Sequence, residues 1–408
     1  MVSTSSERSM NTKEHLETPK VLIVGAGPAG LGVSLALKQA GVTEQLVVDA
    51  RDIGASFENW PKGMSLLSPS FNSNSFGLTD LNAIDPDTSP ADFFKTQHPT
   101  GDVYAKYLKA LAQHFQLPVS TGVEVKSVEK IDEGFKVQST LGEIRPNYIV
   151  WAAGQFFFPR DNDFPGAEHA LHSSKVKDWK QLEGDLFTVV GGYESGVDAA
   201  INLILAGKSV RLIARGEPWT VDHPDPSRCL SPRTFDRLRQ ILKNPELADK
   251  LEFSSHTIVK SIEKGDGFWI LRDQDDIPIA AQTRPILATG FKSGLSIVSD
   301  LFEEDENGAP IFTEEADEST TTSGLFYSGP SLSHRDALFC FIYKFRARFG
   351  VIAAEIAKRL EKPDIEEKLE KHLKAGFMNT DLDCCTNCEC AIEPDESAAP
   401  EPSSFAKA

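Results

Sequence analysis

The chain has 408 residues and a mass of 44.7 kDa, a length that predicts two to three domains. Hydrophobic residues make up 40 % and charged residues 25 %, which excludes a mainly disordered chain, a collagen-like fibre and a small disulfide scaffold. With 42 Lys and Arg against 60 Asp and Glu, the formal charge is −18. Such a chain repels phosphate backbones and anionic membrane surfaces, so we expect neither nucleic acid nor a membrane as a partner.

The first strong signal is a strand that runs directly into a glycine-rich turn. Val21–Val24 is apolar without alternation, as in a strand buried on both faces. It continues into Gly25-Ala26-Gly27-Pro28-Ala29-Gly30 and then into a predicted helix over 31–39, which Gly41 stops. A second apolar strand over 46–48 ends at Asp49. These elements form one βαβ unit.

Each glycine of this turn has a physical role in dinucleotide binding. Gly25 makes the tight turn, Gly27 lets the backbone approach a pyrophosphate, and Gly30 lets the helix pack closely on the strand. The helix N-terminus supplies free N–H groups and a positive dipole end, and Asp49 can accept hydrogen bonds from a ribose. The sequence therefore predicts a dinucleotide site. The alternative is a glycine-rich turn in an unrelated α/β domain.

The same pattern starts again near residue 185. A strand over 186–190, the turn Gly191-Gly192-Tyr193-Glu194-Ser195-Gly196, a helix over 197–206 and a strand over 209–213 predict a second βαβ unit. Tyr193 stands at the middle glycine position, where a side chain hinders close approach of a pyrophosphate. Arg215 lies where an acid would prefer NAD, so its guanidinium favours NADPH. The alternative is a scaffold half that binds no ligand.

The remaining segments are predicted to connect and cover these units. Residues 53–101 are rich in Gly, Pro, Ser and Asn, which indicates long loops that wrap a ligand. Residues 300–319 hold nine acids and no Lys or Arg, which indicates a solvated loop. An apolar stripe over 337–360 predicts one long amphipathic helix, and a short charged helix follows residue 363. Other predicted elements are helices over 101–115 and 231–243 and strands over 123–128, 135–139, 148–152, 286–288 and 325–328.

Two such units predict an α/β fold with two Rossmann-like dinucleotide-binding domains, the nicotinamide domain inserted into the FAD domain. One unit would hold a flavin and the other would bring a hydride donor to it, so the cofactors that we expect are FAD and NADPH. We expect the FAD-binding domain over 20–160 plus 285–362, the NAD(P)H-binding domain over 161–284 and a C-terminal tail over 363–408. The partner that we expect is a small-molecule substrate, and a homo-oligomer is left open.

The N-terminal segment and the lengths of the apolar runs indicate whether the protein is secreted or inserted into a membrane. Residues 1–19 are polar and lack the apolar stretch of a secretory signal, so we expect a disordered tail there and a cytoplasmic protein. No run of about 18 apolar residues occurs, which predicts no membrane insertion.

Several motifs resemble those of flavoproteins with two dinucleotide-binding domains, which include the flavin-containing and Baeyer–Villiger monooxygenases and the thioredoxin reductases. These motifs are the two glycine turns and the strand ends Trp151-Ala152-Ala153-Gly154 and Leu287-Ala288-Thr289-Gly290. The resemblance is closer to the CzcO-like flavoproteins, covers about residues 20–390, and implies fold and cofactor rather than substrate. The motifs that carry it are Ser56-Phe57-Glu58-Asn59-Trp60-Pro61, Ser68-Pro69-Ser70-Phe71, Asp80-Leu81-Asn82-Ala83-Ile84, Thr88-Ser89-Pro90-Ala91, Asp225-Pro226-Ser227, Leu230-Ser231-Pro232, Tyr343-Lys344-Phe345-Arg346-Ala347-Arg348-Phe349 and the terminal cysteines.

The resemblance also implies which residues hold the cofactors. Trp60 would lie near the flavin edge, the Val125 backbone near the adenine, and Gly154 and Gly329 beside the cofactor. The complete set of expected cofactor-binding residues, from both turns and from the resemblance, is Gly25, Gly27, Pro28, Ala29, Gly30, Asp49, Trp60, Val125, Gly154, Gly191, Gly192, Ser195, Gly196, Arg215 and Gly329.

The chain departs from these families at three places. In place of the monooxygenase signature Phe-x-Gly-x-x-x-His, Phe164-Pro165-Gly166 is followed here by a shortened gap to His169 and His172. No Cys-x-x-Cys lies in the predicted nicotinamide domain, which argues against thioredoxin reductase proper. The late Gly-Asp that many such reductases use on the flavin ribityl chain reads Gly329-Pro330.

Four of the six cysteines cluster near the C-terminus, at Cys384, Cys385, Cys388 and Cys390. Four soft ligands so close together suit a metal such as Zn²⁺, Cu⁺ or Cd²⁺. Cys385 and Cys388 also form a Cys-x-x-Cys pair, a spacing that permits a redox-active disulfide and makes them catalytic candidates. The third interpretation is an exposed tail without a role.

The sequence allows a functional or a structural role for several other residues. His98 and His172 could reach the flavin as acid–base groups or be structural. Cys340 is interpreted as a core residue of the long helix. The residues of that helix that would contact FAD phosphates, or else lie on a solvated face, are Lys344, Arg346 and Arg348.

Three functions follow from this sequence. The first is an NADPH-dependent FAD oxidoreductase of monooxygenase type, acting on a small organic substrate. The second is an NADPH-driven reductase of a disulfide or metal–thiol compound that uses Cys385 and Cys388. The third is a metal-binding flavoprotein without turnover, in which Tyr193 blocks the nicotinamide.

Overall fold

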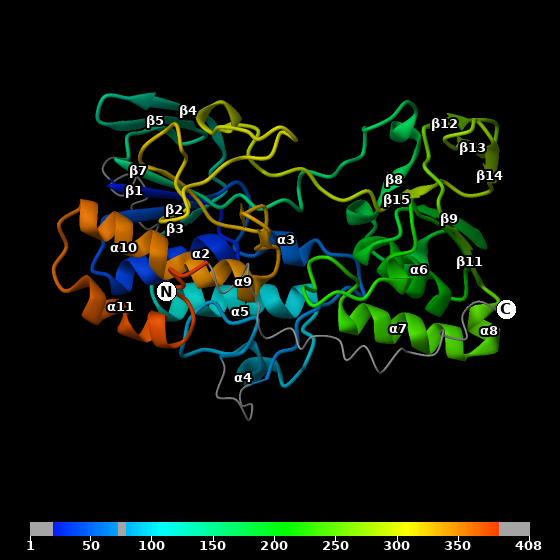
Figure 1. The fold of residues 1–408 in the computed structure, drawn as a ribbon, viewed down its shortest axis with the longest axis horizontal. Coiled ribbons are helices and arrows are strands. Elements are labelled where there is room, and N and C mark those ends of the chain that lie inside the picture. The colour runs from blue at the N-terminus through cyan, green and yellow to red at the C-terminus, as the bar shows by residue number, and fades with distance from the viewer. Residues whose placement is uncertain (1–18, 72–78, 383–408) are drawn as a thin grey trace, which may run out of the picture.

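A computed structural model of the protein describes residues 19–71 and 79–382. Figure 1 shows two units side by side, each built around its own sheet. The disordered tail predicted over residues 1–19 lies, except for residue 19, outside the described residues, and so does the cysteine cluster. Within those residues, no helix combines the length and the apolar character that a membrane crossing requires.

The first unit contains a five-stranded parallel sheet in the order β16-β7-β1-β2-β3. β1 lies at its centre, and no residue of β1 is more than 8 % exposed, which confirms the strand predicted to be buried on both faces. A three-stranded antiparallel sheet, β4-β5-β6, packs nearby. The strands of this unit are β1 (Val21–Val24), β2 (Gln45–Asp49), β3 (Val119–Thr121), β4 (Val125–Ile131), β5 (Gly134–Ser139), β6 (Gly142–Ile144), β7 (Tyr148–Trp151), β16 (Leu325–Tyr327), β17 (Ser333–His334) and β18 (Ala337–Leu338).

Helices cover the first sheet. α2 starts at Pro28, inside the glycine turn, because proline is favoured in the first helical turn, where its missing N–H leaves no bond unmade. A Cβ on Gly32 of α2 would lie 1.9 Å from the Phe349 ring of α10, so this glycine allows the two helices to pack closely. The helices of this unit are α2 (Pro28–Gln39), α3 (Ala55–Glu58), α4 (Pro90–Phe94), α5 (Gly101–His114), α9 (Ile342–Phe345), α10 (Phe349–Arg359) and α11 (Ile365–Lys374), with 3₁₀ turns η5 (Ser299–Leu301) and η6 (Arg346–Arg348).

The second unit contains another five-stranded parallel sheet, in the order β11-β10-β9-β15-β8. All its strands come from residues 171–287, a stretch that lies between β7 and β16 in the chain. Its elements are β8 (Leu171–His172), β9 (Leu186–Val190), α6 (Glu194–Leu205), β10 (Ser209–Ile213), α7 (Pro232–Lys243), α8 (Pro245–Ala248), β11 (Leu251–Ser254), β12 (Ser261–Lys264), β13 (Trp269–Arg272), β14 (Pro278–Ala281) and β15 (Ile286–Leu287), with 3₁₀ turns η1 (Ala167–His169), η2 (Ser173–Lys175), η3 (Trp179–Gln181) and η4 (Pro218–Thr220).

Two chain crossings join the units, and they pair with each other. Pro159 and Phe291 form an antiparallel bridge. The Arg160 N–H donates to the Gly290 carbonyl at 3.0 Å, and the Lys292 N–H donates to the Phe158 carbonyl at 2.7 Å. The outgoing and returning segments are therefore held together where they leave the first unit.

The prediction of a single helix over 337–360 is wrong. Residues 337–338 form β18, which pairs with β17, and the Phe339 N–H donates to the Leu332 carbonyl at 3.0 Å. The helical part is divided into α9, a 3₁₀ turn and α10. The division falls at Arg346 and Arg348, which are both buried although residues two apart point to nearly opposite faces of a helix.

Three cations of this segment are held by protein groups. The Arg348 guanidinium donates to both Asp317 carboxylate oxygens at 3.1 Å, and Asp317 also accepts from His334. Arg346 donates to the carbonyls of residues 80 and 83, and Lys344 donates to the Ser227 hydroxyl at 2.6 Å. They therefore form neither a phosphate site nor a solvated face, contrary to both interpretations from the sequence.

Candidate functional site

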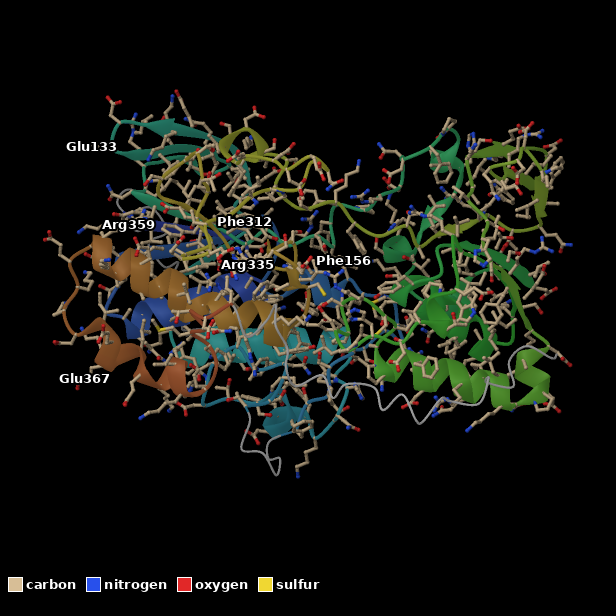
Figure 2. All side chains as sticks on the ribbon, viewed as in Figure 1. Glu133, Phe156, Phe312, Arg335, Arg359 and Glu367 are labelled. Atoms are coloured by element: carbon tan, nitrogen blue, oxygen red, sulfur yellow. The ribbon has the colours of Figure 1, made fainter. Side chains whose placement is uncertain are left out.

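A cavity of about 650 Å³ lies between the two units. It begins at the glycine turn after β1 and extends along the loops that follow β2 and β7. It reaches the N-terminus of α6, through Tyr193, Glu194 and Ser195, so both glycine turns meet one space. Figure 2 shows Phe156, one of its lining residues, at the junction of the units.

The first glycine turn combines two close approaches with one open position. Gly25 has φ +115°, and a Cβ on it would lie 2.2 Å from the Ala152 carbonyl oxygen. A Cβ on Gly30 would lie 1.9 Å from the Gly25 carbonyl oxygen. A Cβ on Gly27 would meet no atom within 4 Å, and Gly27 lines the cavity. The turn therefore leaves room at the start of α2, where a phosphate group would meet free backbone N–H groups.

Asp49 ends β2 and lines the cavity beside this turn. One carboxylate oxygen accepts from the Ala26 N–H at 2.8 Å, and the other accepts from the Arg51 N–H at 2.7 Å. A carboxylate has about four acceptor positions, so both oxygens can still accept from a ribose. Asp49 thus has two roles: it fastens the loop after β2 to the glycine turn and faces the cavity.

The structure brings most of the expected FAD-binding residues to the cavity wall. Trp60 packs its ring 4.8 Å from that of Phe57, and both line the cavity. Gly30 and Gly329 are not lining residues: Gly30 serves close packing, and Gly329, at φ +149°, lies against Tyr327. The expected residues that line the cavity are Gly25, Gly27, Pro28, Ala29, Asp49, Trp60, Val125, Gly154 and Ser195.

The second glycine turn repeats the two close approaches of the first. A Cβ on Gly191 would lie 2.3 Å from the Ala288 carbonyl oxygen, and one on Gly196 would lie 1.6 Å from the Gly191 carbonyl oxygen. At the middle position, the Tyr193 hydroxyl donates to the Cys229 carbonyl at 2.6 Å and to that of Ser227 at 3.2 Å. Burial raises the pKa of Tyr193 to about 12, so it remains a hydrogen-bond donor at neutral pH.

Acidic side chains at the start of α6 bind α7. The Glu194 carboxylate accepts from the Ser231 N–H and from the Thr234 hydroxyl, and Asp198 pairs with Arg237. Burial raises the pKa of both carboxyl groups, while these hydrogen bonds act in the opposite direction. Glu194 and Asp198 also line the cavity beside Ser195, so these contacts join α7 to the cavity wall.

Gly191, Gly192, Gly196 and Arg215 do not line the cavity. A Cβ on Gly192 would lie 2.4 Å from the Ala214 Cβ, so this glycine also serves packing. Arg215 is exposed just beyond β10 and has no hydrogen bond or ion pair with the residues that the structure describes.

Neither histidine candidate reaches the cavity wall. A ring nitrogen of His98 lies 2.9 Å from the Leu66 carbonyl oxygen, and Leu66 is the lining residue. His172 is 1 % exposed, with its ring nitrogens 3.0 Å from the Gly290 carbonyl and 2.9 Å from the Ser174 hydroxyl. Burial lowers the pKa of both imidazoles. Both rings hold loops beside the cavity in this structure.

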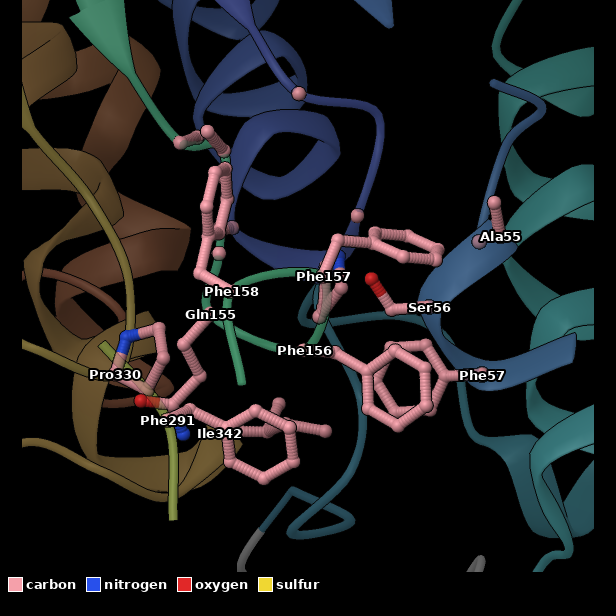
Figure 3. A pocket seen from close by; sticks show the side chains of 18 of the residues that line it. Ala55, Ser56, Phe57, Gln155, Phe156, Phe157, Phe158, Phe291, Pro330 and Ile342 are labelled. Atoms are coloured by element: carbon pink, nitrogen blue, oxygen red, sulfur yellow. The ribbon is translucent and has the colours of Figure 1, made fainter. Parts of the chain in front are cut away.

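Sequence reasoning missed the far wall of the cavity. Cys340 is exposed and lines the cavity with its thiol 3.1 Å from the Ser227 hydroxyl, so its interpretation as core is wrong. Figure 3 shows Gln155 among Phe291, Pro330 and Ile342. The signal that was available is the run Gln155-Phe156-Phe157-Phe158, which begins four residues after the end of β7, near the carboxyl edge of a parallel sheet, where ligands bind.

The cysteine cluster over 384–390 lies outside the described residues. Residues 19–71 and 79–382 contain no group of three or more His, Cys, Asp or Glu side chains arranged to hold a metal ion.

The residues present fit FAD at the first turn. The open position at Gly27, the helix N-terminus beyond it and the remaining acceptor positions of Asp49 match a pyrophosphate followed by a ribose. The aromatic wall further along the cavity suits a flat ring system.

Comparison with known proteins gives the chain its family. Residues 22–329 match the model of the pyridine nucleotide-disulphide oxidoreductases. The chain is 29 % identical to the uncharacterised oxidoreductase CzcO of Bacillus velezensis over 186 residues, 45 % of this chain and about half of that protein. It is 25 % identical to the bacilliredoxin reductase Bdr of Bacillus subtilis over 83 % of this chain and 98 % of that protein.

A solved structure agrees in fold. The ornithine N-hydroxylase of Kutzneria sp. 744 superposes with a TM-score of 0.67 at 15 % identity, covering 84 % of this chain and all of that one. The residues that match the family model cover most of the chain and include the strands of both parallel sheets. This chain therefore belongs to the pyridine nucleotide-disulphide oxidoreductases.

Proposed function

We propose that this protein is an FAD-dependent oxidoreductase that takes a hydride from NADPH. The observation that carries the proposal is the single cavity that the glycine turn after β1 and the start of α6 share. FAD, when bound, accepts a hydride and passes electrons to a second substrate. The chain's own residues bind and orient: Gly27 and Asp49 meet one dinucleotide, and Ser195 faces the other.

The same observation supports two Rossmann-like domains. The FAD-binding domain would comprise 20–160 and 285–362, and the NADPH-binding domain 161–284. The pairing of the two crossings at Pro159 and Phe291 supports boundaries at this point. The NADPH pyrophosphate would approach α6 past Tyr193, whose phenol is held on the 227–229 loop.

For the electron acceptor, we propose oxygen together with a small organic substrate, as in a monooxygenase. NADPH, a proton, oxygen and the substrate would give NADP⁺, water and the oxygenated product. Phe156, Phe291 and Ile342 support this assignment, because an apolar wall excludes water from the reacting groups.

A low-molecular-weight disulfide is the second candidate acceptor. NADPH, a proton and the disulfide would then give NADP⁺ and two thiols. The observation that favours it is the Cys340 thiol on the cavity wall, together with the match to a bacilliredoxin reductase over nearly its whole length. The C-terminal pair Cys385 and Cys388 is the alternative source of thiols, and metal binding by that cluster stays a proposal.

Anaerobic mixing of the holoprotein with NADPH tests the proposal. We expect the flavin absorbance near 450 nm to bleach, because the hydride donor and the flavin share one cavity. Readmitting air with a substrate, or adding a disulfide without air, then separates the two acceptors. A flavin that stays oxidised under NADPH and NADH would contradict the proposed donor and favour the flavoprotein without turnover.

Arg215 is expected to select NADPH over NADH. Replacing Arg215 with alanine should raise the KM for NADPH about 10- to 100-fold and leave that for NADH unchanged, because a charge-assisted hydrogen bond contributes about 1.5–3 kcal/mol. Steady-state kinetics with both donors measures this. The control is Arg211→Ala on β10, because the Arg211 guanidinium pairs with Glu252 at 3.0 Å. Equal effects of Arg215→Ala on the two donors would contradict the assignment.

A further inference from the structure

Two flat side chains meet across the cavity near the first glycine turn. The guanidinium carbon of Arg51 lies 3.6 Å from the centroid of the Phe157 ring. Both residues line the cavity. Figure 3 shows Phe157 on the cavity wall between Phe158 and Ser56. This distance is well inside the range of about 6 Å for an attraction between a cation and an aromatic face.

The order of the strands determines what this contact spans. β1 lies between β2 and β7 in the sheet. Arg51 follows the carboxyl end of β2 by two residues, and Phe157 follows that of β7 by six. Because all three strands are parallel, their carboxyl ends lie at the same edge. A contact between the loops after β2 and β7 therefore crosses the end of β1, where the glycine turn begins.

Hydrogen bonds fix the backbone on both sides of the contact. The Arg51 N–H donates to Asp49 at 2.7 Å, and the Arg51 carbonyl accepts from the Gly122 N–H at 3.0 Å. On the other side, the Phe158 N–H donates to the Gln155 carbonyl at 2.9 Å, closing the turn that holds Phe157. The contact can therefore open through side-chain rotation without a loop movement.

The Arg51 guanidinium keeps its hydrogen-bonding capacity. It has five N–H donors, and none has an acceptor among the residues that the structure describes. A guanidinium that lies on an aromatic face leaves these donors at its edge. A planar fork of this kind suits the oxygens of a phosphate, and the open Gly27 position lines the same cavity as Arg51.

We propose that Arg51 and Phe157 form a clasp over the dinucleotide phosphates, which slows the dissociation of FAD. The inference rests on the proposed FAD site and adds two residues from loops outside the glycine motif. Arg51 supplies the charged contact, and Phe157 holds the guanidinium in place. The dinucleotide leaves only when the pair separates.

The test measures FAD dissociation from Arg51→Gln, Phe157→Leu and the double variant. After dilution of the holoprotein, the recovery of free-flavin fluorescence gives the rate constant. We expect each single variant to release FAD about tenfold faster than the wild type. The rate increase in the double variant should be smaller than the product of the two single increases, because both substitutions break the same contact. Raising NaCl should weaken FAD binding by the wild type more than by Arg51→Gln, because that variant lacks the phosphate contact.

The chain offers a matched control on α7. The Arg239 guanidinium lies 4.7 Å from the Phe235 ring, and neither residue lines the cavity. Arg239→Gln and Phe235→Leu should leave FAD release unchanged. Thermal unfolding of each apoprotein identifies variants that fail to fold, and Arg51→Lys, which keeps the charge without the planar fork, should give an intermediate rate.

The outcomes separate this inference from the proposed function. Wild-type protein that binds no FAD would contradict the FAD site itself. Wild-type protein that binds FAD, with unchanged release and salt dependence in folded Arg51→Gln and Phe157→Leu, would overturn the clasp alone.

Discussion

Replacing Gly27 with leucine is expected to lower the affinity for FAD about 10- to 100-fold while the apoprotein remains folded. Gly27 has φ −86°, which any residue can adopt, and a Cβ there would meet no protein atom within 4 Å. The new side chain would instead enter the space that the dinucleotide requires. Forcing extra carbons into a filled site costs about 1–3 kcal/mol, and 1.4 kcal/mol is tenfold in binding.

Fluorescence titration of the apoprotein with FAD measures the affinity, and urea unfolding measures the fold. Leucine is a poorer N-cap than glycine, so the free energy of unfolding should fall by no more than about 1 kcal/mol. Gly216→Leu is the control, because a Cβ there also meets no atom within 4 Å and the residue does not line the cavity. Gly30→Ala should damage both fold and binding, since its Cβ would lie 1.9 Å from a carbonyl oxygen. An unchanged FAD affinity in Gly27→Leu would contradict the assignment of the FAD site to this turn.

The second large effect is expected on acidification, through His372 of α11. Its side chain is completely buried, and neither ring nitrogen has a hydrogen-bond partner. Burial lowers its pKa from 6.5 to about 4, opposed by the nearby charge of Asp87. Well above pH 6.5 the ring is neutral in both the folded and the unfolded states. Between pH 6.5 and 4 only the unfolded state takes up the proton, so stability falls, by about 2 kcal/mol at pH 5 and about 3 kcal/mol at pH 4.

Urea unfolding at pH 7 and pH 5 tests this expectation. Many carboxylates also titrate in this range, so the informative quantity is the difference between the wild type and His372→Leu. The variant should lose about 2 kcal/mol less than the wild type between the two pH values. His114→Gln, at an exposed position on α5, should follow the wild type. A variant with the same pH dependence as the wild type would contradict a neutral buried ring.

Much of the parallel framework could be predicted from local signals. The apolar runs at Val21–Val24, Leu186–Val190 and Ser209–Ile213 gave strands with these bounds, because strands inside a parallel sheet are buried on both faces. Glycine positions identified both turns, since their steric demands are strict and local. The prediction that an FAD-binding domain and an NAD(P)H-binding domain divide at the chosen residues stays a prediction.

The site beyond the turns could not be predicted in the same way. Cys340 and Ser227 are more than 100 positions apart, and only the packing of one unit on the other brings the thiol and the hydroxyl within 3.1 Å. The helix expected over 337–360 failed because an apolar stripe does not reveal that Arg346 and Arg348 are buried against separate groups. The hydrogen-bond partners of these two arginines come from distant parts of the chain, and the helical spacing of apolar residues does not predict them.

The paired crossings at Pro159 and Phe291 have a consequence for folding. In the chain, the second unit is inserted into the first, and backbone hydrogen bonds join the two ends of this insertion. The entropy of closing such a loop depends only weakly on its length. The first sheet can therefore assemble around an unfolded insertion, and the second sheet, which uses one continuous stretch, can form independently. A short linker from residue 160 to residue 290 would replace the insertion without stretching the chain, because those two residues are already joined by a backbone hydrogen bond of 3.0 Å.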